Sequence, residues 1–311
     1  MKHLFYILIA IALLSTACED PYDIDIEKGE SQLVVDAFIN NDAAIKEIIL
    51  TETVDFFDAN QPPAVRNAEV AIFNLNSGLV YNFTENQTKP GHYQWSDSTL
   101  PILNRIGDVG DTLNLAIVNG TDTFISASVL KRTTAIDSVI FVFEEGNSFT
   151  DEGYYAELKA SDLPGTGDIY WIRSWVNGIY LSKAAEINVA YDASFTPGAS
   201  SDGIPFILPI RTGINPINDD EDEERSDPDQ YVPETPYEIG DSIYVEIWSI
   251  NESTLFFLQQ IQAEVNNGGL FATPPTNVRT NIFNINPNSE KAAVGHFCVS
   301  EVSSGGAKLN P

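Results

Sequence analysis

Short runs of β-branched and aromatic residues, separated by turn signals, recur along most of this chain. From residue 32 to residue 134 the runs that predict strands are 33–39, 45–54, 68–73, 79–83, 92–95, 113–118 and 123–129. Apolar runs of this length between polar turns are typical of strands rather than helices. Asn119-Gly120 joins the last two runs and predicts a two-residue hairpin turn. Seven short strands in a segment of this length favour an immunoglobulin-like β-sandwich over 32–134.

A second, larger β-rich domain is expected over 135–305, followed by a short tail over 306–311. The predicted strands are 136–143, 154–158, 169–176, 179–181, 242–250, 281–285 and 292–301. Asn177-Gly178 predicts another tight hairpin. In the run 242–250, alternation places four residues on one face of the strand: Ile243, Val245, Ile247 and Ser249.

One helix is expected in the C-terminal half, over 252–267. Apolar residues fall there at helical spacing, namely Leu255, Leu258, Ile261 and Val265. Asn251 or Ser253 can cap its start and Gly268-Gly269 can end it. We expect the helix to pack as a plug on a sheet, with a partner-binding helix as the alternative. The fold class is therefore mostly β with a single helix.

The N-terminal segment reads as an export signal. Lys2 and His3 precede an apolar run from residue 4 to residue 14, then small residues, and then Cys18. The run is too short to cross a bilayer as a helix. Residues 14–18 resemble the lipobox of bacterial lipoproteins, which implies cleavage after residue 17 and acylation of Cys18. Residues 18–31 would then be an acidic tether, whereas an ordinary signal with an incidental cysteine is the alternative.

The charge balance excludes some classes of partner. The chain has 45 acidic and 16 basic side chains, a net charge of −29, which argues against nucleic-acid binding. Besides Cys18 the only cysteine is Cys298, which lies in an apolar strand-like run. We therefore expect no disulfide framework and interpret Cys298 as a buried thiol.

No sequence motif indicates catalysis. The chain lacks G-x-S-x-G, P-loop and G-x-G-x-x-G patterns. His3 would be removed with the signal, so His92 and His296 are too few for a three-histidine zinc site. We expect a non-enzymatic protein without a cofactor. Glycan hydrolysis by two unassigned carboxylates stays open as an alternative.

Residues 218–229 hold eight carboxylates and suggest weak binding of a divalent cation. Asp220 and Asp222 occupy the third and fifth places of an EF-hand-like count. However, the sixth place is Glu223 instead of glycine, and the twelfth is Asp229 instead of a bidentate glutamate. A solvated acidic insertion is the favoured interpretation.

Aromatic residues gather around the second hairpin and form the candidate recognition surface: Tyr170, Trp171, Trp175 and Tyr180. Strand alternation places Tyr170 and Ile172 on one face, with Trp171 and Arg173 on the other. One face can be core while the other contacts a ligand or partner. Ordinary packing of both faces is the alternative.

Several segments together resemble the DUF4249 family of Bacteroidetes lipoproteins. The matching segments are 18–20, 24–26, 33–39, 51–57, 62–63, 68–72, 274–282 and 293–297. Residues 284–288 depart from the family, which commonly has a glycine-containing turn there. The family has no established activity, so the resemblance carries over no active residue. Its members are often encoded near TonB-dependent receptors, which implies an outer-membrane role, and the acids after Cys18 resemble a surface-export signal.

From these observations we expect an acylated outer-membrane lipoprotein, anchored by lipid and displayed on the cell surface. It would bind a ligand or accompany a TonB-dependent receptor in nutrient uptake. A surface glycan hydrolase and a structural adhesin or spacer are the alternatives.

Overall fold

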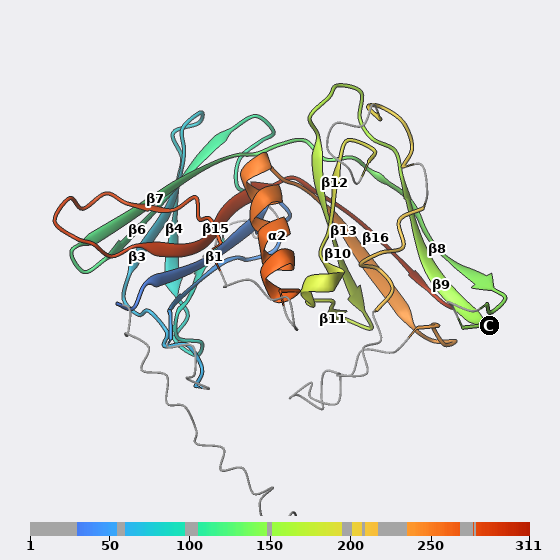
Figure 1. The fold of residues 1–311 in the computed structure, drawn as a ribbon. Coiled ribbons are helices and arrows are strands. Elements are labelled where there is room, and N and C mark those ends of the chain that lie inside the picture. The colour runs from blue at the N-terminus through green and yellow to red at the C-terminus, as the bar shows by residue number, and fades with distance from the viewer. Residues whose placement is uncertain are drawn as a thin grey trace, which may run out of the picture. The chain divides into compact units, whose positions relative to one another are not determined.

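The computed structural model describes residues 30–54, 60–96, 105–147, 151–194, 201–206, 209–216, 235–267, 276 and 278–311. The strands and the helix of these residues are drawn in Figure 1. The fold is mostly β with one α-helix among the described residues, as the sequence predicts.

The first sheet has nine strands. Their order across the sheet is β14 (Phe283–Asn284), β7 (Asp122–Val129), β6 (Thr112–Asn119), β3 (Glu69–Asn74), β4 (Val80–Glu85), β5 (His92–Trp95), β2 (Lys46–Glu52), β1 (Leu33–Asn40) and β15 (Ala293–Ser300). Every second residue of β1 and β6 is buried, and these residues share one core with those of β2–β5, β7 and β15. The Val299 amide of β15 donates to Ser128 Oγ of β7 at 3.0 Å, so the sheet curls until these strands meet.

The second sheet has five strands. β10 (Ile169–Val176) pairs with β13 (Ser242–Ser249) on one side and with β11 (Ile179–Tyr180) and β12 (Asn188–Tyr191) on the other. β16 (Val302–Lys308) pairs with the far side of β13. A separate hairpin is formed by β8 (Ile136–Glu144) and β9 (Gly153–Ala160). It packs against the five-stranded sheet, and the two together bury a second core. Ile243, Val245 and Ile247 are buried in the second core, so they share one face of β13 as predicted, whereas Trp248 is buried in a different apolar cluster.

The chain passes between the two sheets more than once, which two consecutive domains would not do. After β13 the chain returns to the first sheet, where β15 pairs in parallel with β1, and then enters the second sheet as β16. The expected segments 32–134 and 135–305 therefore do not correspond to the two sheets strand for strand. Because the first sheet includes the returning strand β15, its strand order does not confirm the predicted immunoglobulin-like sandwich over 32–134.

The expected tail over 306–311 is wrong. β16 extends to Lys308, and Leu309 is buried in the second core. The stretch from Val302 onwards is rich in serine and glycine and has no apolar pattern. Backbone pairing with β13 makes it a strand, and side-chain periodicity cannot reveal that.

The two predicted hairpins differ in their turns. Asn177 and Gly178 both have positive φ, at 50° and 86°, and connect β10 to β11 as predicted. In the first hairpin Asn119 pairs with Asp122, so the two loop residues are Gly120 and Thr121 instead of Asn119-Gly120. Gly120 has φ of 63°, which suits a turn with glycine at its first central position.

The predicted helix is α2 (Glu252–Val265), and it packs between elements of both sheets. The Asn251 side chain accepts the Thr254 amide at 2.9 Å and caps its start. Leu255 and Leu258 are buried in a third core that includes residues of β10, β13 and β15. Val265, the last member of the predicted stripe, is exposed. Residues 268 and 269 lie outside the described part of the chain.

Candidate ligand-binding site

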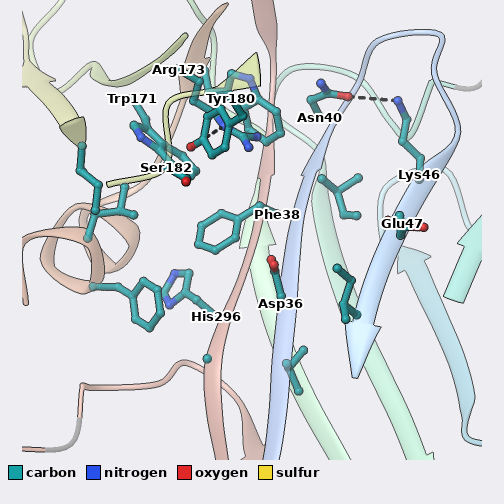
Figure 2. Close-up of a pocket in the computed structure, with 18 of the residues that line it drawn as sticks. Asp36, Phe38, Asn40, Lys46, Glu47, Trp171, Arg173, Tyr180, Ser182 and His296 are labelled. Carbon is teal, nitrogen blue, oxygen red and sulfur yellow. Dashed lines mark hydrogen bonds between the residues drawn. The ribbon is translucent and has the colours of Figure 1, made fainter. Parts of the chain in front are cut away.

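A cavity of about 630 Å³ lies between the outer face of the first sheet, the second sheet and α2 (Figure 2). On the first sheet its walls come from β1, β2 and β15. On the other side they come from β10, β11, β13 and α2. The cavity thus forms where chain segments far apart in sequence converge.

The alternation of β1 explains which side chains reach the cavity. Leu33, Val35, Ala37 and Ile39 point into the first core and are buried. The intervening residues line the cavity, including Asp36, Phe38 and Asn40. Strand geometry therefore places one carboxylate and one aromatic ring on the cavity wall.

The opposite wall holds an arginine enclosed by aromatic rings. Four ring centres lie 4.5–5.4 Å from Cζ of Arg173, and they belong to Trp171, Trp175, Tyr180 and Trp248. Arg173 Nε also donates to the Tyr180 hydroxyl at 3.3 Å. Cation–π attraction and this hydrogen bond hold the guanidinium in one position.

The carboxylate across from Arg173 on the neighbouring strand, Glu246, accepts hydrogen bonds from other side chains. Glu246 is the register partner of Arg173 on β13, but its oxygens accept the Trp248 indole N–H at 2.6 Å and the Tyr244 hydroxyl at 3.1 Å. No carboxylate in the described part of the chain forms an ion pair with Arg173. The terminal guanidinium nitrogens of Arg173 are therefore available to bind a ligand in the cavity.

Asp36 presents an accessible carboxylate inside the cavity. The protein surrounding it raises its pKa by desolvation, and the charge of Arg173 partly opposes this rise. Glu47 on β2 lines the same wall and raises the pKa of Asp36 further by repulsion. Glu47 itself contacts His92 Nδ1 at 3.3 Å.

A buried histidine closes the end of the cavity beside α2. The His296 ring stacks on Phe257, with 4.6 Å between ring centres, and on Phe38, with 5.9 Å. Its Nε2 lies 3.0 Å from Thr254 Oγ1. Burial lowers the pKa of His296 from 6.5 to about 4, so the ring is neutral near pH 7.

Lys46 is a buried residue of β2 that lines the cavity, and Asp42 compensates its charge. Its ammonium contacts Asp42 Oδ1 at 2.5 Å and donates to Asn40 Oδ1 at 3.1 Å. Of the two cations among the cavity-lining residues, Arg173 is thus the one without an anionic partner in the described structure.

The family model described as a domain of unknown function, DUF4249, matches residues 19–305, which include every residue lining the cavity. The chain belongs to the DUF4249 family. No curated protein and no solved structure is significantly similar to it.

The DUF4249 chain brings three of the four candidate recognition residues together. All three contact Arg173: Trp171 and Trp175 lie on the same face of β10 as Arg173, as alternation predicts, and Tyr180 comes from β11. Tyr170 lies on the opposite face, fully buried in the second core, and donates to Asp162 Oδ1 at 2.6 Å. Tyr170 is therefore separate from the cavity.

The remaining predicted site residues lie outside the described part of this DUF4249 chain. They are Cys18 and the acidic residues Asp220, Asp222 and Asp229. In the part that is described, no group of three or more histidine, cysteine or carboxylate side chains could hold a metal ion. Among the described residues no helix has the length and apolar character needed to cross a membrane. Cys298 is a free, buried thiol, as expected.

Sequence reasoning missed the charged residues of the DUF4249 cavity. Asp36 is the only charged residue in the apolar run 33–39, and His296 holds the same position in the run 293–299. A single ionisable residue in an otherwise apolar strand is a signal for a special environment. Glu47 and Arg173 gave no such signal, because they sit in strands with mixed composition.

Proposed function

We propose that this protein is a lipid-anchored envelope protein that binds a small molecule, without catalysis, in the cavity between β1, β10 and α2. The observation that carries the proposal is the cavity itself. Its volume of about 630 Å³ lies within the range of known small-molecule sites. It also combines apolar and aromatic walls with a few fixed polar groups, as such sites do.

The membrane attachment would come from acylation of Cys18, with the residues before β1 acting as a tether. Support comes from the apolar run and small residues that precede Cys18. Mass spectrometry of the mature N-terminus should find a lipid thioether on that cysteine. An unmodified thiol, or release of the protein into the medium, would contradict the anchor.

An outer-membrane receptor of the TonB-dependent type is the proposed partner in nutrient uptake. The family resemblance supports this partner through the receptor genes often found near its members. Co-purification from detergent-solubilised outer membranes should recover such a receptor with the wild-type protein. Repeated recovery of none would contradict the partnership while leaving ligand binding untouched.

Ligand binding can be tested by filling the cavity. Val34 lines the cavity, whereas Val80 is an exposed strand valine in the first sheet. A panel of amino acids, peptides, sugars and organic acids should contain a compound that raises the melting temperature of the wild type. Val34→Trp should abolish this shift and Val80→Trp should keep it. Equal shifts in both variants would place binding outside the cavity.

A surface glycan hydrolase is the second candidate. It is favoured by two carboxylates on one cavity wall, Asp36 with a raised pKa and Glu47 beside it. A pair of carboxylates facing one site is typical of glycoside hydrolysis. Turnover of a glycan panel that disappears in Asp36→Asn would establish this function. Binding without turnover would reject it.

A further inference from the structure

The cavity holds opposite charges that do not pair with each other. Arg173 lies on the β10 wall and Asp36 on the β1 wall, and both line the same space (Figure 2). No ion pair joins them, and no described side chain forms a hydrogen bond or ion pair with the Asp36 carboxylate. Asp36 is exposed to the cavity, with the Phe38 backbone amide as a hydrogen-bond donor, and Arg173 is partly exposed, so both charges are accessible to a ligand that pairs with both.

We propose that the cavity binds a zwitterionic short peptide, with its carboxylate on Arg173 and its ammonium on Asp36. This inference rests on the ligand-binding function proposed above. Arg173 suits the first role because the aromatic rings and Tyr180 fix its guanidinium while the terminal nitrogens stay unpaired. A planar guanidinium presents two parallel N–H groups to a carboxylate.

The β1 wall suits an ammonium group. Asp36 and Glu47 both line it, and the nearest lysine, Lys46, is already neutralised by Asp42. A ligand carrying only negative charge would be repelled by these two carboxylates, and one carrying only positive charge would be repelled by Arg173. A neutral sugar would leave both charges without partners.

Much of the cavity wall is apolar. Phe38 on β1, Phe257 and Leu258 on α2 and Trp171 on β10 line the cavity. Apolar side chains of a ligand would pack there. The cavity volume of about 630 Å³ matches a drug-sized ligand, so a dipeptide or tripeptide fits the class better than a free amino acid.

Calorimetry with the mature full-length protein tests the assignment without any variant. The probes are apolar dipeptides and tripeptides with free termini, the same peptides acetylated at the amine or amidated at the carboxylate, and neutral oligosaccharides. Free peptides should bind, and each blocked form should bind at least about tenfold more weakly, because it loses a charge-assisted contact. Equal binding of free and blocked peptides would overturn the proposal.

Variants assign the two ends of the ligand. Arg173→Met keeps an apolar stem among the rings and should weaken free peptides while leaving amidated peptides unchanged. Asp36→Asn should weaken free peptides while leaving acetylated peptides unchanged. Arg66→Met is the matched control, because Arg66 is an exposed arginine paired with Glu85 outside the cavity, and its peptide affinity should equal that of the wild type.

If Arg173→Met fails to fold, Asp36→Asn and the blocked peptides still decide the outcome. Binding of an oligosaccharide that Val34→Trp abolishes would overturn the peptide assignment and keep the proposed function. Absence of binding by every probe, in a protein shown to be folded, would overturn both.

Discussion

Titration of His296 should make the stability of this protein depend on pH. Thr254 Oγ1 donates to Asn251 Oδ1 at 2.9 Å, so it accepts the hydrogen bond from His296 Nε2–H. This leaves Nδ1 of His296 as the site of protonation, and Nδ1 has no partner among the described residues. Protonation would therefore place an unpaired charge in the core beside α2.

The sign and size of the effect follow from the two pKa values. The pKa of His296 is about 4 in the folded protein, against 6.5 when the side chain is solvated. Below pH 6.5 the unfolded chain takes up a proton that the folded protein excludes, so stability falls as the pH is lowered. The loss is about 2 kcal/mol at pH 5 and about 3 kcal/mol below pH 4.

Urea unfolding followed by tryptophan fluorescence measures this loss from pH 7.5 to pH 4.5. His296→Phe is the comparison, because a phenyl ring retains the stacking on Phe38 and Phe257 but cannot titrate. The difference between wild type and variant cancels the titration of the many carboxylates shared by both. It should change by about 2 kcal/mol between pH 7.5 and pH 5.

A difference that stays constant with pH would refute the reasoning. It would mean that the folded protein stabilises the imidazolium as well as water does. Asp36 is the register partner of His296 on β1 and lines the same cavity, although no ion pair joins it to the ring in the described structure.

Three further predictions concern single residues. Gly295 has φ of 95°, and an added Cβ would lie 2.0 Å from the Val35 carbonyl oxygen, so Gly295→Ala should lower the free energy of unfolding by at least about 3 kcal/mol in urea titrations. Gly120→Ala is its control, because a Cβ there meets open space, and it should lower this free energy by only about 1 kcal/mol. Asn251→Ala removes the cap of α2 and should lower the same free energy by about 1 kcal/mol. Burial raises the pKa of the Cys298 thiol, so it should react with a thiol reagent only when urea unfolds the protein.

Two of these outcomes would point to specific errors. Equal effects of the two glycine substitutions would show that β1 and β15 are not in such close contact at Val35. Fast thiol labelling of the folded protein would show that the third core opens readily around Cys298.

The local structure of this protein was largely predictable. Alternating or continuous apolar runs identified β1 to β11 and β13 to β15, and the turn residues Asn177-Gly178 defined one hairpin correctly. β12 and β16 were missed because their side chains carry little periodicity, and their partner strands hold them through the backbone. A glycine-rich strand such as β16 cannot be recognised from side chains alone.

The candidate site was predictable only in part. Strand alternation correctly placed Trp171 and Arg173 on one face of β10 and Tyr170 on the other. The partner wall could not be inferred, because Asp36 lies more than a hundred residues away in the sequence. Its contribution depends on how the first sheet packs against α2 and the second sheet.

The strongly acidic charge, the mostly β class, the capped helix and the family could all be read from the sequence alone. These properties depend on composition, short-range periodicity and local turn chemistry, which act within a few residues. The tertiary structure alone decided that β15 returns to pair with β1, that Arg173 is enclosed by four rings, and that Asp36 faces it across a cavity. Those arrangements arise from the packing of segments distant along the chain, whose relative placement follows from burying three separate apolar cores together.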